Sequence, residues 1–363
     1  MTFTTAEQQL YARHFTLPEF GVEGQKRLKR ARVLVVGAGG LGSPVLLYLA
    51  AAGVGHIGIV DDDVVDVTNL QRQVLYTHED IGTLKVDAAK RRLQALNPHI
   101  QITTHAERLT VDNALRIIQQ YDIVADGTDN FTTRYLVNDA CVLADKVNVY
   151  ASIFRFEGQV SVFNLLRADG SRGPHYRDLF SEPPATGTVP SCAEGGVLGV
   201  LPGIIGSLQA NEVIKVAAQV GEPLDGRLFL FDAASFTSRV LKIATTSSVK
   251  VERLEAINEI YCEVTSIPTI SVDEFKQLQS EDADFQLIDV REEYEYEAQN
   301  IGGLNMPLSE LEQHIEQISR EKQVVVHCKS GARSQQAVQM MREQFGLNNT
   351  YSLEGGLLAA VAN

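Results

Sequence analysis

Apolar and polar residues alternate along this chain of 363 residues in blocks that predict strands and helices in turn. Two short apolar runs, 33–36 and 57–60, enclose a glycine-rich turn and a helical pattern over 45–52. Further along, a helical pattern over 85–96 stops at an Asn-Pro pair, which commonly ends a helix. Strands that alternate with helices predict a parallel α/β sheet, in which ligands bind at the carboxyl ends of the strands.

The pattern predicts a second, smaller α/β unit beyond a stretch, 244–268, that breaks the alternation. We expect a large domain over 1–245, a linker over 246–266 and a small domain over 267–363. A polar stretch over 167–190 is too irregular for regular structure and is a candidate active-site loop. The remaining helical patterns cover 7–15, 111–120, 272–279, 309–318 and 334–344, and the remaining strand patterns cover 100–104, 121–125, 147–153, 157–164 (antiparallel), 227–233, 238–243, 285–290 and 324–327.

Composition excludes several classes of function. The net charge of −14 argues against a nucleic-acid-binding protein, because phosphates require a basic face. No run approaches about eighteen apolar residues, so we expect no membrane-spanning helix, and the first residues lack a signal-peptide pattern. The four cysteines stand far apart with no CxxC pair, so we expect a cytoplasmic protein whose thiols are either buried or reactive.

The turn after the first apolar run carries four glycines, Gly37, Gly39, Gly40 and Gly42. Between a strand and a helix, such glycines make the tight turn, let the backbone approach a phosphate and let the helix pack on the strand. The helix N-terminus then offers free N–H groups and a positive dipole end to an anion. Asp61 follows about twenty residues later, where a carboxylate can hold ribose hydroxyls. This loop alone leaves the nucleotide open, with NAD or FAD as common occupants.

A second candidate site lies near the other end of the sequence, where an apolar strand pattern ends at Cys328. The loop that follows reaches a helical pattern through Lys329, Ser330, Gly331, Ala332 and Arg333. Consecutive loop N–H groups can form an anion nest and the helix dipole adds positive potential, so both favour a thiolate nucleophile. The alternative is a buried structural cysteine.

Four residues separate Cys328 from Arg333, one fewer than in the phosphate-binding loop of protein tyrosine phosphatases, and a shorter ring suits one sulfur atom. Together with Asp-Val-Arg at 289–291, this loop resembles that of a rhodanese domain over 267–363. The resemblance implies that the cysteine carries a persulfide. The sequence departs from the family at 301–303, where Ile-Gly-Gly replaces the usual His-Ile-Pro-Gly turn.

In the large domain, Asn-Leu-Gln-Arg at 69–72, a lysine at a helix start and Asp-Gly-Thr-Asp-Asn at 126–130 together resemble the ubiquitin-activating superfamily. Within it, the chain resembles adenylyltransferases of the HesA, MoeB and ThiF type, which act on sulfur carriers. The resemblance implies a Rossmann-like sheet and a reaction in which a carboxylate attacks the α-phosphate of ATP. It also implies Mg²⁺ on Asp129 and an ATP site formed by Gly37, Gly39, Gly40, Gly42, Asp61, Asp63, Thr68, Asn69, Leu70, Gln71, Arg72, Lys85, Asp129 and Asn130.

Further roles come from the same resemblance. Arg13 matches an arginine that reaches the neighbouring subunit's site, which implies a homodimer and a catalytic role beside Arg72 and Lys85. Cys192 matches a cysteine with which some family members form a thioester or disulfide with the carrier, whereas others do without it. Cys141, in an apolar helical run, is expected in the core.

The adenylyltransferase family usually also binds a structural Zn²⁺ through two CxxC pairs. The corresponding positions here read Pro-His-Tyr-Arg-Asp over 174–178, and the second region offers Cys262 with Thr265 where its partner should be. Because tetrahedral structural sites favour cysteine and histidine, this would be a poor zinc site, and we expect none.

We therefore predict an α/β enzyme that adenylates the C-terminal Gly-Gly carboxylate of a small β-grasp sulfur carrier with ATP and Mg²⁺. Persulfide sulfur on Cys328, supplied by a donor such as a cysteine desulfurase, would then give a thiocarboxylate, with Cys192 resolving an acyl disulfide. The carrier subunit of molybdopterin synthase is the first candidate, and thiamin or tRNA-thiolation carriers are alternatives. The rival classes are an NAD-dependent oxidoreductase with a rhodanese-like appendage and a non-enzymatic scaffold.

Overall fold

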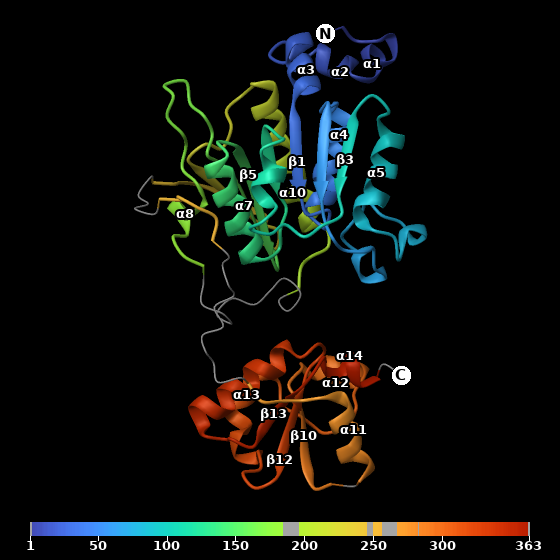
Figure 1. Cartoon of the computed structure of the whole chain (residues 1–363), viewed down its shortest axis with the longest axis vertical. Coiled ribbons are helices and arrows are strands. Elements are labelled where there is room, and N and C mark those ends of the chain that lie inside the picture. The colour runs from blue at the N-terminus through green and yellow to red at the C-terminus, as the bar shows by residue number, and fades with distance from the viewer. Residues whose placement is uncertain (1, 184–195, 245–249, 256–266, 282, 362–363) are drawn as a thin grey trace. The chain divides into compact units, whose positions relative to one another are not determined.

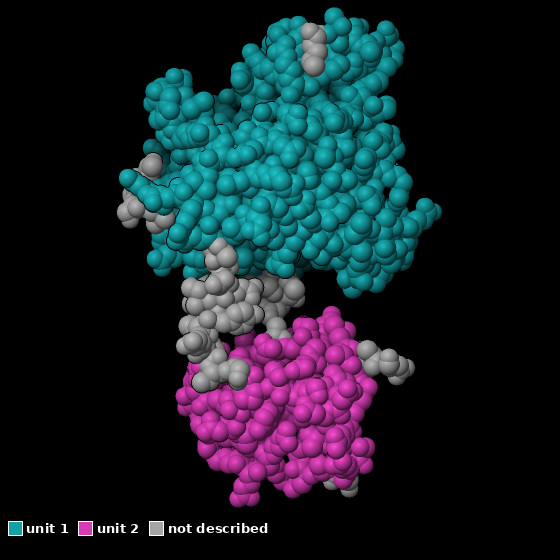
Figure 2. All heavy atoms as spheres, in the orientation of Figure 1, with its two compact units in different colours: residues 1–259 teal, residues 260–363 magenta. Residues whose placement is uncertain are grey.

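The computed structural model describes residues 2–183, 196–244, 250–255, 267–281 and 283–361. The chain divides into two compact units, residues 1–259 and 260–363, which Figure 2 colours separately. Among the described residues, no helix is both long enough and apolar enough to cross a membrane.

The first unit is built on one mixed sheet of eight strands (Figure 1). Its strands are β1 (Arg32–Val36), β2 (His56–Val60), β3 (Gln101–His105), β4 (Ile123–Asp126), β5 (Val147–Phe154), β6 (Glu157–Phe163), β7 (Arg227–Asp232) and β8 (Thr237–Lys242). They lie in the order β3-β2-β1-β4-β5-β6-β7-β8, with β3 to β5 parallel and the remaining pairs antiparallel. The predicted Rossmann-like α/β class is confirmed.

Helices surround this sheet, on both faces and at the end where the parallel strands begin (Figure 1). They are α1 (Thr5–Leu10), α2 (Ala12–Phe15), α3 (Gly21–Arg30), α4 (Gly42–Ala52), α5 (Lys85–Leu96), α6 (Ala114–Ile118), α7 (Phe131–Leu143), α8 (Tyr176–Leu179) and α10 (Leu201–Ala218), with 3₁₀ turns η1 (Val67–Asn69) and η2 (His78–Asp80). Strand β1 shows why its sequence is apolar throughout. Val33 and Val35 pack into one core with residues of α4 and α10, while Leu34 and Val36 pack into another with residues of α6 and α7.

The second unit contains a parallel sheet of five strands in the order β11-β10-β12-β13-β9. Its central strand, β12, is buried and leads to Cys328. The elements are β9 (Thr269–Ile270), α11 (Val272–Ser280), β10 (Phe285–Asp289), α12 (Glu293–Ala298), β11 (Leu304–Asn305), η3 (Leu308–Gln317), β12 (Gln323–His327), α13 (Ala332–Phe345), β13 (Thr350–Leu353) and α14 (Gly356–Val361).

The structure corrects three local predictions. The helix expected over 309–318 is the 3₁₀ segment η3, in which residues three apart align, so Leu308 with Leu311 and Ile315 with Ile318 face the core. The stretch 167–190 is not wholly irregular, because it contains α8, whose Tyr176 is buried. Part of the expected linker belongs to the first unit, since Leu254 packs against the core beneath α6 and α7.

Candidate active sites

The glycine turn between β1 and α4 is fixed by two of its four glycines. Gly37 has φ +90°, and a Cβ there would lie 3.1 Å from the Gly127 carbonyl oxygen. A Cβ on Gly42 would lie 2.0 Å from the Gly37 carbonyl oxygen, so only glycine allows this turn. At Gly39 a Cβ would meet nothing nearer than the Gln73 side chain, at 3.7 Å. The turn therefore leaves its backbone approachable at Gly39, as phosphate binding requires.

Asp61, at the end of β2, holds this turn in place. Its Oδ2 accepts a hydrogen bond of 2.8 Å from the Ala38 N–H, and its Oδ1 accepts one of 2.9 Å from the Asp63 N–H. The Tyr76 hydroxyl donates to the Ala38 carbonyl at 2.8 Å. Burial raises the pKa of Asp61. Each carboxylate oxygen keeps a second lone pair, which is available to a ribose hydroxyl.

Two cations are linked to the same turn. The buried Lys85 places its Nζ 2.7 Å from Oδ2 of Asp63, and its N–H donates to the Asp63 carbonyl at 2.9 Å. Arg72 donates to the Thr68 carbonyl at 3.0 Å, and its Cδ would lie 3.8 Å from a Cβ on Gly40. The structure thus brings together glycines, carboxylates and cations from the segments that follow β1, β2 and η1 and from α5, and such a set can neutralise the charge of a triphosphate.

The other predicted residues of this segment have visible structural roles. Thr68 donates to Asp66 through both its N–H and its hydroxyl, and the Asn69 side chain accepts from the Asp66 N–H at 3.1 Å. Leu70 packs its side chain against the core. Gln71 lies against Gly199, where a Cβ would approach its Oε1 to 2.3 Å.

The end of β4 supplies the carboxylate predicted to bind Mg²⁺. Asp129 is exposed, and Asn130 caps α7 by accepting from the Thr133 N–H at 2.8 Å. On the other side of β1, Asp61, Asp62 and Asp63 place one carboxylate oxygen each within 4.8 Å of one another. These oxygens flank the glycine turn on both sides, and oxygen donors of this kind fit Mg²⁺.

Sequence reasoning missed Arg134 as part of this site. The buried Arg134 donates to the Thr128 carbonyl at 3.1 Å, while Oδ1 of the buried Asp126 accepts from the Thr128 N–H and hydroxyl at 3.0 and 2.6 Å. Thr128 is therefore held at three atoms, directly before Asp129. The sequence signal that could have indicated it is an arginine within an otherwise apolar helical pattern.

Arg13 lies near the N-terminal ends of the parallel strands, whereas the glycine turn lies at their C-terminal ends. Tyr11, next to α2, accepts a hydrogen bond of 2.8 Å from Asn97, which precedes β3, so α2 packs where the parallel strands begin (Figure 1). The side chain of Arg13 is exposed and forms no hydrogen bond or ion pair with the described residues. A strand of five residues is about 17 Å long, so Arg13 is far from the glycine turn of its own chain.

In the second unit, the loop after β12 surrounds the sulfur of Cys328. The thiol is 1% exposed, and its Sγ accepts from the Gly331 N–H at 3.2 Å. Gly331 has φ +100°, and the N–H groups of Leu357 and Leu358 donate to the Cys328 and Lys329 carbonyls at 2.7 and 3.1 Å. The start of α14 therefore fixes the loop. Lys329 and Ser330 are exposed, and Arg333 is half-buried.

Residues 289–291 brace the strand beside this loop. Arg291 donates to the Asp289 carboxylate at 2.6 Å through Nη2, and both side chains are buried. The fully buried His327 has its Nε2 3.7 Å from Asp289 Oδ2, and burial lowers the pKa of this imidazole. At the departure noted over 301–303, a Cβ on Gly303 would lie 2.6 Å from the Leu287 carbonyl oxygen, so this backbone requires glycine.

Two family models match the chain, that of the ThiF family over residues 11–251 and that of the rhodanese-like domain over residues 271–363. The chain belongs to the ThiF family. This ThiF-family chain is 44% identical to the probable adenylyltransferase/sulfurtransferase MoeZ of Mycobacterium tuberculosis, over 96% of this chain and 91% of that protein.

Two further relatives extend the comparison. The adenylyltransferase and sulfurtransferase MOCS3 of Arabidopsis thaliana is 39% identical over 97% of this chain and 83% of its own. The sulfur carrier protein adenylyltransferase of Thermus thermophilus is 54% identical over 67% of this chain and 90% of its own. Among solved structures, E. coli MccB with ATP shares the fold, with a TM-score of 0.55 and 22% identity over 66% of this chain and 75% of that one. The chain is an enzyme of the adenylyltransferase and sulfurtransferase class.

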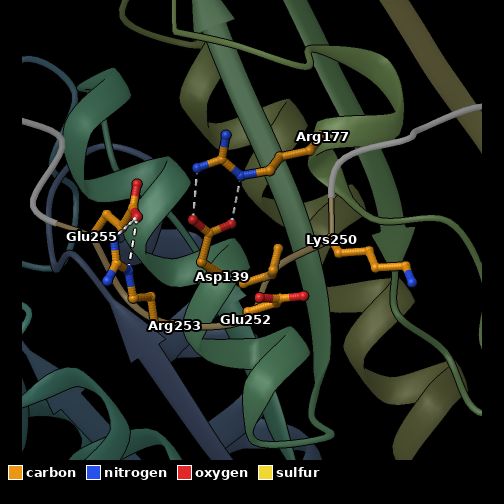
Figure 3. Close-up of a pocket in the computed structure, with 7 residues that line it drawn as sticks. Asp139, Arg177, Lys250, Glu252, Arg253 and Glu255 are labelled. Carbon is orange, nitrogen blue, oxygen red and sulfur yellow. Dashed lines mark hydrogen bonds and ion pairs between the residues drawn. The ribbon is translucent and has the colours of Figure 1, made fainter.

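The ThiF-family chain does not fit zinc at positions 174–178. His175 and Asp178 are the metal-binding side chains there, and His175 Nε2 lies 3.8 Å from Asp178 Oδ2. Between them Arg177 donates to both oxygens of Asp139, at 2.8 and 2.7 Å. This Asp139–Arg177 pair, the clasp, lines a charged pocket together with side chains of the segment 250–255 (Figure 3). Two donor side chains, one of them a carboxylate, are fewer than the four cysteine or histidine ligands that a structural zinc site favours.

Of the remaining cysteines, the structure describes only Cys141. Cys192, Cys262 and Thr265 lie outside the described residues. Cys141 is fully buried and unpaired, as predicted, and burial raises its pKa well above the usual value. It belongs to the core beneath α6 and α7.

Proposed function

We propose that this enzyme adenylates the C-terminal carboxylate of a small β-grasp sulfur carrier and then converts it to a thiocarboxylate with sulfur from Cys328. The observation that carries the proposal is the pairing, within one chain, of a phosphate-type glycine turn with cations and a buried cysteine in a loop of N–H groups. The carrier subunit of molybdopterin synthase is the first candidate, because a relative from Porphyra purpurea, 38% identical, is a probable molybdopterin-synthase adenylyltransferase.

In the first step, a carboxylate oxygen of the carrier attacks the α-phosphorus of ATP and pyrophosphate leaves. Arg72 and Lys85 stabilise the negative charge that develops on the phosphates, and Asp61 orients the ribose. Asp129 would hold Mg²⁺, which would neutralise charge on the pyrophosphate. Arg134 and Asp126 act through Thr128, whose position fixes Asp129.

In the second step, the outer sulfur of a Cys328 persulfide attacks the carbonyl carbon of the acyl-adenylate, and AMP leaves. The product is an acyl disulfide between the carrier and Cys328. The thiolate of Cys192 attacks the Sγ of Cys328, so that the carrier leaves as a thiocarboxylate and the two cysteines form a disulfide, which a cellular thiol reduces. Both activities in one chain raise the effective concentration of the persulfide.

The assembly follows from the same proposal. Arg13 is exposed at the end of the sheet where the parallel strands begin, away from its own glycine turn. It therefore completes the site of a second copy in a homodimer. A cysteine desulfurase is the donor of the persulfide. Because free cysteine thiols persist in reducing conditions, the enzyme works in the cytoplasm.

The test is to incubate the enzyme with ATP, Mg²⁺, a persulfide donor and one purified carrier at a time, and to weigh the carriers. We expect one carrier, that of molybdopterin synthase, to exchange one oxygen for one sulfur. Pyrophosphate exchange into ATP should depend on that carrier. Oxidation or reduction of a nicotinamide without ATP, or no change in the mass of any carrier, would contradict the proposal.

A further inference from the structure

The arginine of the persulfide loop already forms a salt bridge with a carboxylate. Arg333 Nη1 and Nη2 donate to Oε2 and Oε1 of Glu295 at 2.6 and 2.9 Å, and both side chains are largely buried. These hydrogen bonds hold the pKa of Glu295 below its usual value. The Nη1 and Nη2 edge of the guanidinium, which could bind an oxyanion with two hydrogen bonds, is therefore engaged by Glu295 of α12. Among the described residues of the loop, Lys329 alone offers an exposed, unpaired cation.

The surroundings add negative charge. Glu292, Glu293, Glu295 and Glu297 fall within six residues at α12, and Glu293 and Glu297 are exposed. From residue 265 onward the sequence holds 16 acidic and 7 basic side chains, a net charge of −9. A dianion that approaches this unit meets a repulsive field.

We infer that Glu295 determines which class of sulfur donor the enzyme accepts, by keeping Arg333 from binding a free oxyanion. The inference rests on the proposed persulfide role of Cys328. The favoured donor is a persulfide carried on a thiol, which presents sulfur and no oxyanion. The disfavoured donor is thiosulfate, whose three oxygens require hydrogen-bond donors at the mouth of the loop.

Both donors undergo the same balanced exchange. The Cys328 thiolate attacks the outer sulfur of the donor, a new S–S bond forms, and the old S–S bond breaks with its electron pair on the inner sulfur. A persulfide leaves as a thiolate, whereas thiosulfate leaves as sulfite. Sulfite carries two negative charges, so a bidentate Arg333 would stabilise its departure, and Glu295 keeps Arg333 from doing so.

The experiment compares Glu295→Gln with the full-length parent, and uses mass spectrometry to follow sulfur on Cys328 supplied by thiosulfate or by glutathione persulfide. We expect kcat/KM for thiosulfate to rise about tenfold through a lower KM, since a freed charge-assisted hydrogen bond contributes about 1.4 kcal/mol. The rate with glutathione persulfide should change by less than about twofold. Glu297→Gln, an exposed acid of the same helix, is the matched control and should change neither rate.

The outcomes distinguish the role of Glu295 from the proposed persulfide role of Cys328. If the parent takes up sulfur but Glu295→Gln leaves thiosulfate unchanged, the inference is wrong and the persulfide role stands. The inference also falls if Glu295→Gln loses uptake from both donors, because the pair is then merely structural. Glu295→Asp, which keeps the charge, should restore the low thiosulfate rate. If the parent takes up sulfur from neither donor, the proposed role of Cys328 fails.

Discussion

The glycine turn and the Cys328 loop each follow a buried parallel strand and each lead into a helix, α4 in the first unit and α13 in the second. Around the glycine turn, side chains from β2, η1, α5 and the end of β4 are drawn together, and several remain exposed. Around Cys328, one loop and the start of α14 suffice, and the sulfur is almost wholly buried. The difference matches the chemistry, because a triphosphate carries charge spread over many oxygens, whereas a persulfide adds a single sulfur atom to the cysteine.

The strongest test of this difference is to inactivate one site and measure the activity of the other. We expect Lys85→Met to reduce carrier-dependent pyrophosphate exchange by about 10²–10³-fold, because a cation that stabilises the transition state is lost. Sulfur uptake by Cys328 should be unchanged. Cys328→Ser should abolish sulfur uptake and thiocarboxylate formation while pyrophosphate exchange persists. Loss of both activities in either variant would mean that the two sites depend on each other.

A second copy of the chain should matter to the first site only. Arg13→Ala should reduce pyrophosphate exchange by about 10²-fold without affecting sulfur uptake, because its guanidinium would act in the partner's site. A mixture of Arg13→Ala and Lys85→Met chains, unfolded and refolded together, should regain about a quarter of the parent activity, since half the dimers then hold one complete site. Mixtures that stay inactive, or a parent that is monomeric, would contradict the shared site.

Sequence predicted the parts of each site that are local in the chain. The helix over 85–96 was predicted to the residue because a Gly-Thr pair precedes it and an Asn-Pro pair follows it. The burial of Arg134 could not be predicted from the sequence. It depends on Asp126 and on the Tyr150 ring, 5.3 Å from its guanidinium, and the order of the strands in the sheet brings these residues next to it. Glu295 escaped notice for the same reason, since its partner Arg333 lies 38 positions away.

The same limit applies to the stretch that was expected to connect the two units. Residues 244–268 break the α/β alternation and therefore indicate a connection, yet Leu254 packs on the first unit and Ile267 on the second. An isolated leucine among charged residues carries no periodic signal. Only the tertiary surface beneath α6 and α7 makes it part of a core.

The smallest of the expected effects concerns stability in the first unit alone. The clasp is a nearly buried pair, with Asp139 and Arg177 side chains 6% and 14% exposed. Asp139→Asn leaves an uncompensated guanidinium and should lower the free energy of unfolding by about 3 kcal/mol. Asp145→Asn removes a 75% exposed partner of Arg172 and should cost about 0.3 kcal/mol, which makes it the matched control. Urea unfolding followed by circular dichroism measures both.

Metal removal decides whether the clasp or a zinc ion maintains this region. Because residues 174–178 supply only His175 and Asp178 as metal ligands, while Arg177 is paired with Asp139, we expect the purified enzyme to contain no stoichiometric zinc and a chelator to leave its urea midpoint unchanged. Asp139→Asn should lower the midpoint of the first unit, and sulfur uptake by Cys328 should stay at the parent's rate. One zinc per chain, with a midpoint that falls on chelation, would show that donors outside the described residues complete a metal site and that the clasp is secondary to it.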